Sequence, residues 1–402
     1  MAGFLIHLLL FLTIASFPLY LFPSGGIQIS HVLFSIFCLF FFIVKGKTIF
    51  KIDKKIKPIF RALGAFVLLA CIVQGSWAAI HGDYFVLIFP GFYVFNVTYL
   101  IVIYAYLRNY KDFGVSLVFF AMLTSVGLVF VGLVAGVSVS SYRRTSFFNN
   151  PNQLGYFALL ASIIILLFHT RFKFKYSRVL SMGAVLINLY LSSVSLSKAA
   201  MVSTAVAIAC FLPIFKKTDL AIMTLIVAVT FPFWLPKVTG SDVYAKAALR
   251  MERIGADKDD SVFGRGYGRI MDHPEQLFLG AGEGNVGRWG EEIELHSMFG
   301  NTLFCYGFLG LTIILIFFFR CFMVSPIVFT ILFAPVFAYC LTHNGIRFSY
   351  MWMLLAIYIY METRPVERTR KSVFLTGKYI NAIAPNRALP AKQQFSNQYP
   401  YR

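Results

Sequence analysis

The chain has 402 residues, of which 58% are hydrophobic and only 13% are charged. Soluble domains carry about 25% charged residues and do not bury this much apolar surface, so the composition excludes an ordinary soluble enzyme. The net charge of +19 does not indicate a nucleic-acid partner, because the lysines and arginines stand between apolar stretches and form no continuous basic domain.

Twelve apolar stretches follow one another along the chain, and each approaches the roughly 20 residues that a membrane-spanning helix needs. Their continuous apolar character favours helices over a membrane barrel, whose strands alternate apolar and polar residues. We therefore expect an all-α polytopic membrane protein with about twelve spans, at residues 3–22, 27–44, 59–80, 84–107, 113–137, 153–170, 179–196, 199–215, 219–236, 297–319, 323–342 and 346–361.

The basic residues predict which ends of these spans face the cytoplasm. With the N-terminus inside, the inner segments and the C-terminal tail hold 24 of the 36 lysines and arginines, and the outer segments hold 12. Cytoplasmic segments are the ones enriched in these residues, and the run KGKTIFKIDKKIKP at 45–58 is the strongest such signal. We expect both termini in the cytoplasm.

The domain organisation follows from this topology. Residues 1–361 form the membrane domain, and residues 362–402 form a basic cytoplasmic tail. The membrane domain includes one large extracytoplasmic loop, 237–295, which carries eight basic and eleven acidic residues. A polar segment of this length between spans is uncommon unless it is functional.

Two short helices are expected in this loop. The first covers 242–254, and the second covers about 261–272 and stops before Pro274. On the second helix Arg265 and Arg269 are four residues apart and share a face.

The predicted outer face carries several basic side chains, although the positive-inside rule disfavours them there. Arginine binds phosphate with two parallel hydrogen bonds, and lysine supplies a point charge. We interpret these residues as ligands of a diphosphate, and pairing with the acidic residues of the loop is the alternative for any one of them. We expect Arg143, Arg265 and Arg269 to converge on one cavity and Lys198 and Arg347 to lie near its rim, and the complete set of candidates is Arg143, Arg144, Lys198, Arg265, Arg269 and Arg347.

Three stretches, taken in order, resemble the O-antigen polymerase and O-antigen ligase family of polytopic membrane glycosyltransferases. RRTSFFNNPN at 143–152 is similar to the family's Arg-x-x-Gly-x-x-x-Asn-Pro-Asn pattern, with Ser146 at the glycine position. SKA at 197–199 is similar to its Ser-Arg-Gly turn, with lysine in place of arginine. The stretch from HPEQLFLGAGEGN through His296 to GFLG at 307–310 is similar to its succession of Pro, Gly-x-Gly, His and Gly-Leu-Leu-Gly.

The resemblance covers about residues 120–320 and implies a function. It implies transfer of a glycan from an undecaprenyl-diphosphate-type donor at the periplasmic face of the bacterial inner membrane. The acceptor would be another lipid-linked repeat unit in a polymerase, which we favour, or a lipid A-core sugar in a ligase. Membrane lipids and other proteins of polysaccharide assembly are the further expected partners. A transporter of lipid-linked glycans, and a structural subunit of an export complex, remain alternatives from other classes.

His296 is the candidate catalytic residue, because it stands where the outer loop re-enters the membrane. A neutral imidazole can accept a proton from an acceptor hydroxyl near neutral pH. Glu283 and Glu294 are rival bases, and an interfacial or capping histidine is the structural alternative. The histidines show no metal-ligand spacing, so we expect neither a metal nor another cofactor.

The glycine-rich run at 280–284 invites comparison with a nucleotide-binding loop. No strand precedes it, and the predicted topology places it outside the cell. We interpret Gly280, Gly282 and Gly284 as a turn that lets the backbone pack closely.

Overall fold

The structure is a computed structural model of the chain. It describes residues 2–23, 26–49, 52–137, 143–171, 176–239, 263–290 and 294–364, together with the single positions Ala245, Leu249, Glu252 and Ser261. The predicted loop helix at 242–254 and the tail from 365 onward therefore lie outside the described residues, apart from the single positions named. The chain divides into two units, Met1–Glu362 and Thr363–Arg402.

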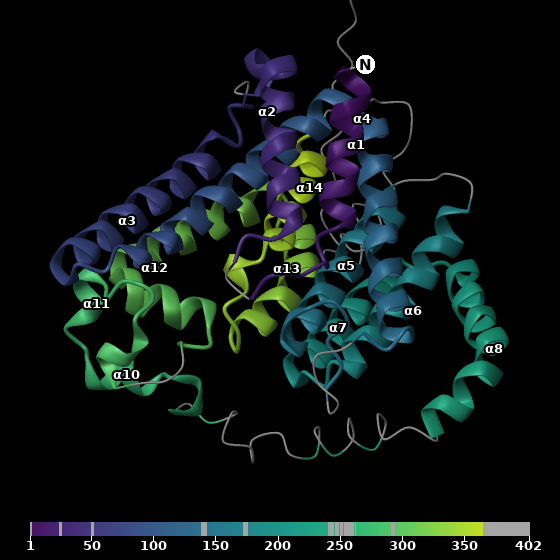
Figure 1. Ribbon diagram of the computed structural model, residues 1–402. Helices are drawn as coiled ribbons and strands as arrows, with labels where there is room; N and C mark the ends of the chain where they lie inside the picture. Colours follow the sequence, from purple (N-terminus) through teal and green to yellow (C-terminus); the bar gives the residue numbers. More distant parts are fainter. Residues whose placement is uncertain are drawn as a thin grey trace, which may run out of the picture. The chain divides into compact units, whose positions relative to one another are not determined.

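The described residues form helices and no strands (Figure 1). The α-helices are α1 (Ala2–Ala15), α2 (Ile29–Ile49), α3 (Lys57–His81), α4 (Ile88–Val134), α5 (Pro151–Arg171), α6 (Ser177–Val194), α7 (Lys198–Phe211), α8 (Lys217–Thr239), α10 (Gly268–Asp272), α11 (Gln276–Leu279), α12 (Met298–Val324), α13 (Pro326–Cys340) and α14 (Ser349–Thr363). Short 3₁₀ turns accompany them at η1 (Tyr84–Leu87), η2 (Leu212–Ile214), η4 (Phe263–Arg265), η5 (Val286–Trp289) and η6 (Gly345–Arg347).

The chain is a helical membrane protein, as its composition predicts. Among the described residues, six helical segments are long and apolar enough to cross a membrane: Ile29–Gly46, Lys57–His81, Tyr84–Val134, Pro151–Thr170, Ser177–Val194 and Met298–Val324. Three shorter apolar helices lie at Ala2–Ala15, Lys198–Ile214 and Pro326–Cys340. The predicted spans fall on these and the remaining long helices, but their number, twelve, stays a prediction.

Helix α4 shows why span and helix counts differ. It contains two predicted spans, and its backbone leaves helical geometry at Lys111, where φ is 47° and ψ is −126°. This break falls in the short basic connection predicted between the spans, which includes Arg108. The two halves are therefore one helix by hydrogen bonding, with a kink at the predicted boundary.

The core of the membrane domain is built on α14 and α5. All residues of α14 from Ser349 to Tyr360 are buried, and 83% of the apolar window of α5 is buried as well. A helix that is apolar on all sides and buried on all sides belongs at the centre of a bundle. Apolar side chains of α2 and α3, such as Leu39 and Leu68, are exposed instead, as expected for surfaces that face lipid.

The outer loop packs against α12 through its glycines. Helix α12 breaks at Gly307, where φ is 66°, and α11 lies beside it (Figure 1). The amides of Ala281 and Gly282 donate to the carbonyls of Phe304 and Cys305 at 2.8 and 2.9 Å. A Cβ at Gly280 would lie 2.5 Å from a backbone oxygen, so the predicted close-packing role of this turn is confirmed.

The predicted helix at 261–272 is wrong as a single element. The structure has the 3₁₀ turn η4, a break at Gly266 with φ of 75°, and then α10. Glycine takes this left-handed conformation without strain, which lets the chain turn here. Arg265 and Arg269 therefore do not share one helical face.

Candidate functional site

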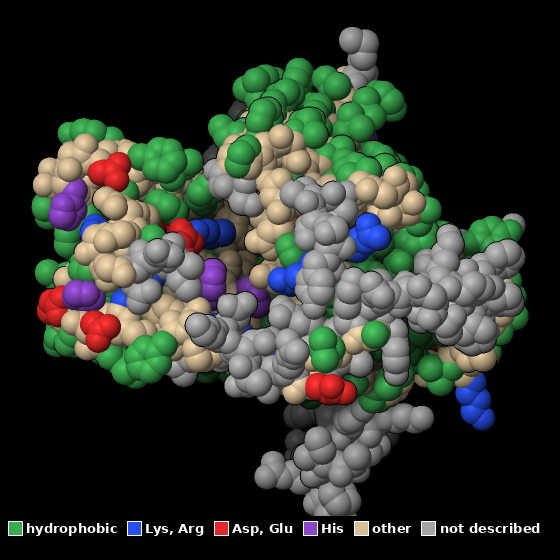
Figure 2. Space-filling view, turned by 60° about the horizontal axis from the view of Figure 1, so that its bottom comes forward, with side chains coloured by type: hydrophobic (Ala, Val, Ile, Leu, Met, Phe, Trp, Pro, Cys, Tyr) green, Lys and Arg blue, Asp and Glu red, His purple; other side chains and the backbone are tan. Residues whose placement is uncertain are grey.

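The segments that the topology places on the outer side contact one another. Arg143 donates from Nε to the Ser195 carbonyl at 3.0 Å, and Tyr267 donates to the Leu341 carbonyl at 3.3 Å. Trp77, at the end of α3, donates to the Gly280 carbonyl at 2.9 Å. Figure 2 shows a face of the molecule on which basic, acidic and histidine side chains gather around a hollow.

The RRTSFFNNPN stretch is folded around the start of α5. The Asn150 side chain accepts from the Asn152 amide at 2.7 Å, and Pro151 occupies the first helical position, a common pattern at helix N-termini. Asn152 then turns its own Oδ1 toward Arg143, which donates to it from Nη2 at 2.9 Å. This hydrogen bond thus joins Arg143 to the start of α5, nine residues further along the chain.

Arg144 and Lys198 lie near this stretch in different settings. Arg144 is exposed, and its amide donates to the Val194 carbonyl at 3.3 Å. Lys198 is half-buried and begins α7, directly after its N-cap residue Ser197. A lysine at a helix N-terminus meets the positive end of the helix dipole, which costs free energy and suits a nearby anion.

His296 is held at the entrance to α12. Ser297 caps the helix by accepting from the Gly300 amide at 3.1 Å, and Leu295 is buried. His296 itself is exposed, and its amide donates to the Arg265 carbonyl at 3.0 Å. The structure therefore places the predicted base and one predicted diphosphate ligand side by side.

Arg265 connects His296 to a residue that the sequence analysis did not single out. Its Nη1 donates to the Thr342 carbonyl at 2.8 Å, and the Thr342 hydroxyl lies 3.0 Å from Nδ1 of His343. The His343 ring stacks on Tyr339, with ring centres 4.5 Å apart. The only signal in the sequence was a second histidine in a predicted outer connection, four residues before Arg347 in the run HNGIR.

A second chain of contacts reaches His343 from Arg143. Asn152, which binds Arg143 through its side chain, accepts through its carbonyl from the Tyr339 hydroxyl at 3.0 Å. Tyr339 carries the stacked His343 ring. We call the group that these contacts bring together the basic cluster: Arg143, Arg265, His296 and His343.

The pKa of His343 reports on this cluster. The pKa of His343 is lowered to about 3, and burial of the ring is the largest cause. Repulsion by Arg265, by His296 in its protonated form and by Arg143 lowers this pKa further. The cluster is thus a site of concentrated positive potential, and His343 stays neutral inside it at physiological pH.

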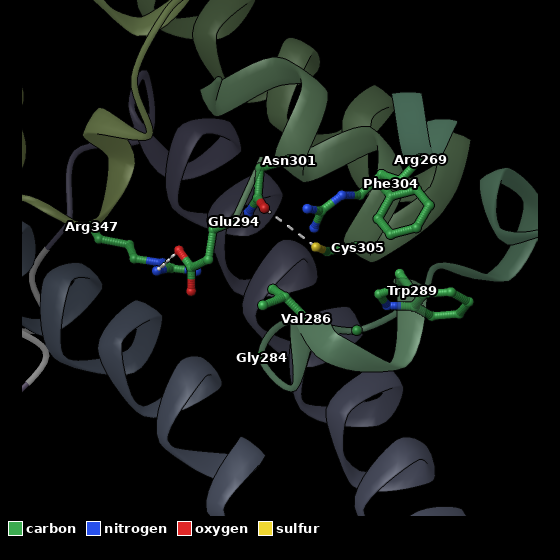
Figure 3. A pocket seen from close by; sticks show the side chains of 10 residues that line it. Arg269, Gly284, Val286, Trp289, Glu294, Asn301, Phe304, Cys305 and Arg347 are labelled. Carbon is green, nitrogen blue, oxygen red and sulfur yellow. Dashed lines mark hydrogen bonds and ion pairs between the residues drawn. The ribbon is translucent and has the colours of Figure 1, made fainter. Parts of the chain in front are cut away.

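Arg269 and Arg347 line a separate small cavity. Figure 3 shows their guanidinium groups entering it from opposite sides, with Glu294, Asn301 and Trp289 around them. Its volume of about 10 Å³ is room for about one water molecule. Arg269 is 3% exposed, with its guanidinium 5.9 Å from the ring centre of Phe304.

Arg347 is engaged by two carboxylates. It donates from Nη1 to Glu294 at 2.8 Å and from Nη2 to Glu283 at 2.5 Å. Although burial lowers the pKa of Arg347, the two carboxylates raise it, and the pKa lies well above its usual value. Arg347 thus makes the pairing with acidic residues of the loop that is the alternative to its predicted diphosphate role, and that role stays a prediction.

Glu283, a rival candidate for the general base, accepts hydrogen bonds at both side-chain oxygens. Its side chain is 1% exposed, and its Oε1 accepts from Tyr93 at 2.5 Å and from Asn301 at 3.1 Å. Its backbone amide and carbonyl pair with the side chain of Gln74 at 2.8 and 3.0 Å. We call this set the carboxylate network: Glu283, Glu294, Arg347, Tyr93, Asn301 and Gln74.

The structure connects some of the predicted residues. Contacts through Thr342, His343, Tyr339 and Asn152 link Arg265 and His296 to Arg143, whereas Arg269 and Arg347 line the cavity of Figure 3, whose lining includes neither Arg143 nor Arg265. The convergence of Arg143, Arg265 and Arg269 on one cavity stays a prediction.

Metal binding and comparison with known proteins give no further assignment. Within the described part of the chain, no group of three or more His, Cys, Asp or Glu side chains could hold a metal ion. No protein-family model matches the chain, and a search of curated proteins finds no match.

Proposed function

We propose that the chain is a membrane glycosyltransferase that moves a glycan from a polyprenyl-diphosphate carrier to an acceptor sugar hydroxyl, at the periplasmic face of a bacterial inner membrane. The observation that carries this proposal is the basic cluster. Arg143, Arg265 and His296 come from distant parts of the chain, and the sequence predicts the two arginines as diphosphate ligands and the histidine as the base. The order of motifs in the sequence supports the same reaction.

The chemistry assigns a role to each group. Negative charge grows on the diphosphate as its bond to the sugar breaks, and fixed arginines stabilise that charge. His296, which is exposed, accepts the proton that the acceptor hydroxyl loses as it attacks. One displacement with one base inverts the anomeric centre and needs neither a metal nor a covalent glycosyl intermediate, unlike the two-carboxylate retaining route.

We favour polymerisation of surface-polysaccharide repeat units over ligation to lipid A-core, and both reactions would use the same donor site. Deletion of the gene separates the two. Loss of a polymerase leaves single repeat units on the core, whereas loss of a ligase leaves an unmodified core.

The direct test uses the purified protein in liposomes with an undecaprenyl-diphosphate-linked oligosaccharide. We expect release of the carrier diphosphate together with a new glycosidic bond. His296→Ala should lower turnover by about 10²-fold or more while donor binding persists. His273→Ala is the matched control, because His273 lies in the same loop but contacts Glu275 and Trp289 instead of the cluster. Transport of the donor without bond formation would reject the proposal and favour a transporter.

A further inference from the structure

His343 occupies the place where two chains of contacts meet. One runs from His296 through Arg265 and Thr342, and the other runs from Arg143 through Asn152 and Tyr339. These segments are far apart in the sequence, so the position of His343 among the cations is a product of the fold. The glycosyl-transfer mechanism above gives this histidine no role.

The hydrogen bonds of Thr342 fix the tautomer of His343. The Thr342 hydroxyl donates to the Tyr339 carbonyl at 3.0 Å, and it has only one proton to donate. Nδ1 of His343, 3.0 Å from the same oxygen, is then the donor in their contact. The neutral ring therefore carries its proton on Nδ1 and its lone pair on Nε2, which leaves Nε2 as the nitrogen that can gain a proton.

The charged groups that act on His343 come from each element packed against it. Arg265 follows from η4, His296 from the start of α12, and Arg143 from the segment before α5. Tyr339 and Tyr267 are the neighbouring phenols, the first stacked on the ring and the second bound to the Leu341 carbonyl. Arg265 and Arg143 are cationic, so they oppose protonation of the ring until an anion enters.

The residue after His343 points to a missing polar partner at this place. Both amide atoms of Asn344, Nδ2 and Oδ1, are buried and have no hydrogen-bond partner among the described residues. Buried amide groups are paired in the great majority of structures, and exceptions commonly mark a site for water, an ion or a ligand. This amide belongs to the residue next to His343, so it is a second polar group at this place for which the described residues supply no partner.

We propose that His343 is a further diphosphate-binding residue of the basic cluster, and that it takes up a proton when the anion binds. This inference rests on the proposed function for the identity of the anion. The two negative charges of a bound diphosphate offset the positive charges of Arg265 and Arg143, which otherwise oppose a proton on the ring. Protonated His343 then presents Nε2–H to a phosphate oxygen as a charge-assisted donor.

Proton uptake at His343 also suits the reaction. The diphosphate gains charge as its bond to the sugar breaks, and a cation formed on donor binding adds to the fixed arginines at that moment. The proton comes from solvent during binding, while the proton of the acceptor hydroxyl goes to His296. The two histidines thus carry separate protons.

The test follows the protonation of His343 directly. The full-length protein, labelled with ¹³C at its histidine rings and held in nanodiscs, is titrated by NMR with and without inorganic pyrophosphate. His343→Gln assigns the signal by its loss, and His273→Gln serves as the control. Without pyrophosphate the His343 signal should stay that of a neutral ring from about pH 5 to 8. With saturating pyrophosphate its midpoint should rise by about 4 units or more, into the range near neutral pH, because the anion carries at least two negative charges and each opposite charge nearby shifts a pKa by about 1–3 units.

The outcomes separate the two proposals. A His343 signal that pyrophosphate leaves unchanged, while His296 responds, rejects the role of His343 and leaves the diphosphate site standing. A His343 response in a preparation that forms no glycosidic bond supports the anion site and rejects the proposed transfer reaction. Failure of pyrophosphate to perturb any histidine of the cluster, with glycosyl transfer intact, rejects the inference.

Discussion

Nη2 of Arg347 lies 2.5 Å from Oε2 of Glu283, and this contact joins the connection between α13 and α14 to the segment between α11 and α12. The carboxylate of Glu283 is almost fully enclosed, so the arginine is what balances its charge. Nη1 of the same guanidinium binds Glu294, two residues before the proposed base His296. Arg347 is accordingly a positioning residue, which holds the loop beside the basic cluster.

The pairing of Arg347 with Glu283 predicts that removing one of the two charges destabilises the protein much more than removing both. Arg347→Ala should lower the free energy of unfolding by about 3–5 kcal/mol, because it leaves a buried carboxylate without a partner. The double variant Arg347→Met with Glu283→Gln should recover much of this loss, since it removes both charges together. Thermal unfolding of the detergent-purified protein measures both effects, with the exposed Arg144→Ala as control. Equal destabilisation by the single and double variants would contradict this account of the pair.

How far the sequence predicts this fold is clear from α4 and α14. Their apolar runs were enough to predict helices, because a membrane requires every backbone group to be paired within its segment. The break at Lys111 was also foreseen, from the basic residues between two apolar runs. The irregular loop was not: Gly266 divides an expected helix, and only the three-dimensional contacts of η4 with the 341–342 connection explain the turn.

The candidate site likewise contains residues that the sequence identified and contacts that it did not. Arg143 and Arg265 were selected because basic residues are disfavoured on the predicted outer side of the membrane. Both lie in the basic cluster. The same argument also selected Arg347, because the charge pattern alone does not show that an arginine is bound by carboxylates such as those of Glu283 and Glu294. Polar residues within apolar spans, such as Gln74 and Asn301, were the unused signal for the carboxylate network.

The break in α12 gives a second prediction. A Cβ at Gly307 would lie 2.6 Å from the Phe278 carbonyl oxygen, and φ there is 66°. Gly307→Ala should therefore displace α11 from α12 and destabilise the protein, by about 1 kcal/mol for the backbone strain alone. Gly64→Ala on α3 is the matched control: its Cβ meets nothing within 4 Å, and alanine favours a helix. Thermal unfolding should rank Gly307→Ala below wild type and Gly64→Ala at or above it, and the reverse order would reject this role of the break.

Ser146 gives a third prediction, at the position where the resembled family has glycine. Its φ is 50°, a conformation that costs an L-residue about 1–2 kcal/mol. Its hydroxyl donates to the Val129 carbonyl at 2.9 Å, which offsets part of that cost. Ser146→Gly loses the hydrogen bond but also the strain, so its stability should stay near that of wild type. Ser146→Ala loses only the hydrogen bond and should be less stable than Ser146→Gly by about 1 kcal/mol, and equal stability of the two variants would show that the conformation is not strained.

Lys198 gives the last prediction, which separates a functional charge from a structural one. The residue begins α7, where the helix dipole disfavours a cation by about 0.3–1 kcal/mol. If Lys198 serves the donor diphosphate, Lys198→Ala should lower glycosyl transfer by about 10²-fold, the loss typical of a removed charge donor. Lys198→Arg keeps the charge and should retain most of the transfer rate. The measurement pairs turnover with thermal unfolding on the same preparations, so that any change in stability is seen beside the change in turnover. Equal losses of turnover in Lys198→Ala and Lys198→Arg, at equal stability, would reject a role for the charge.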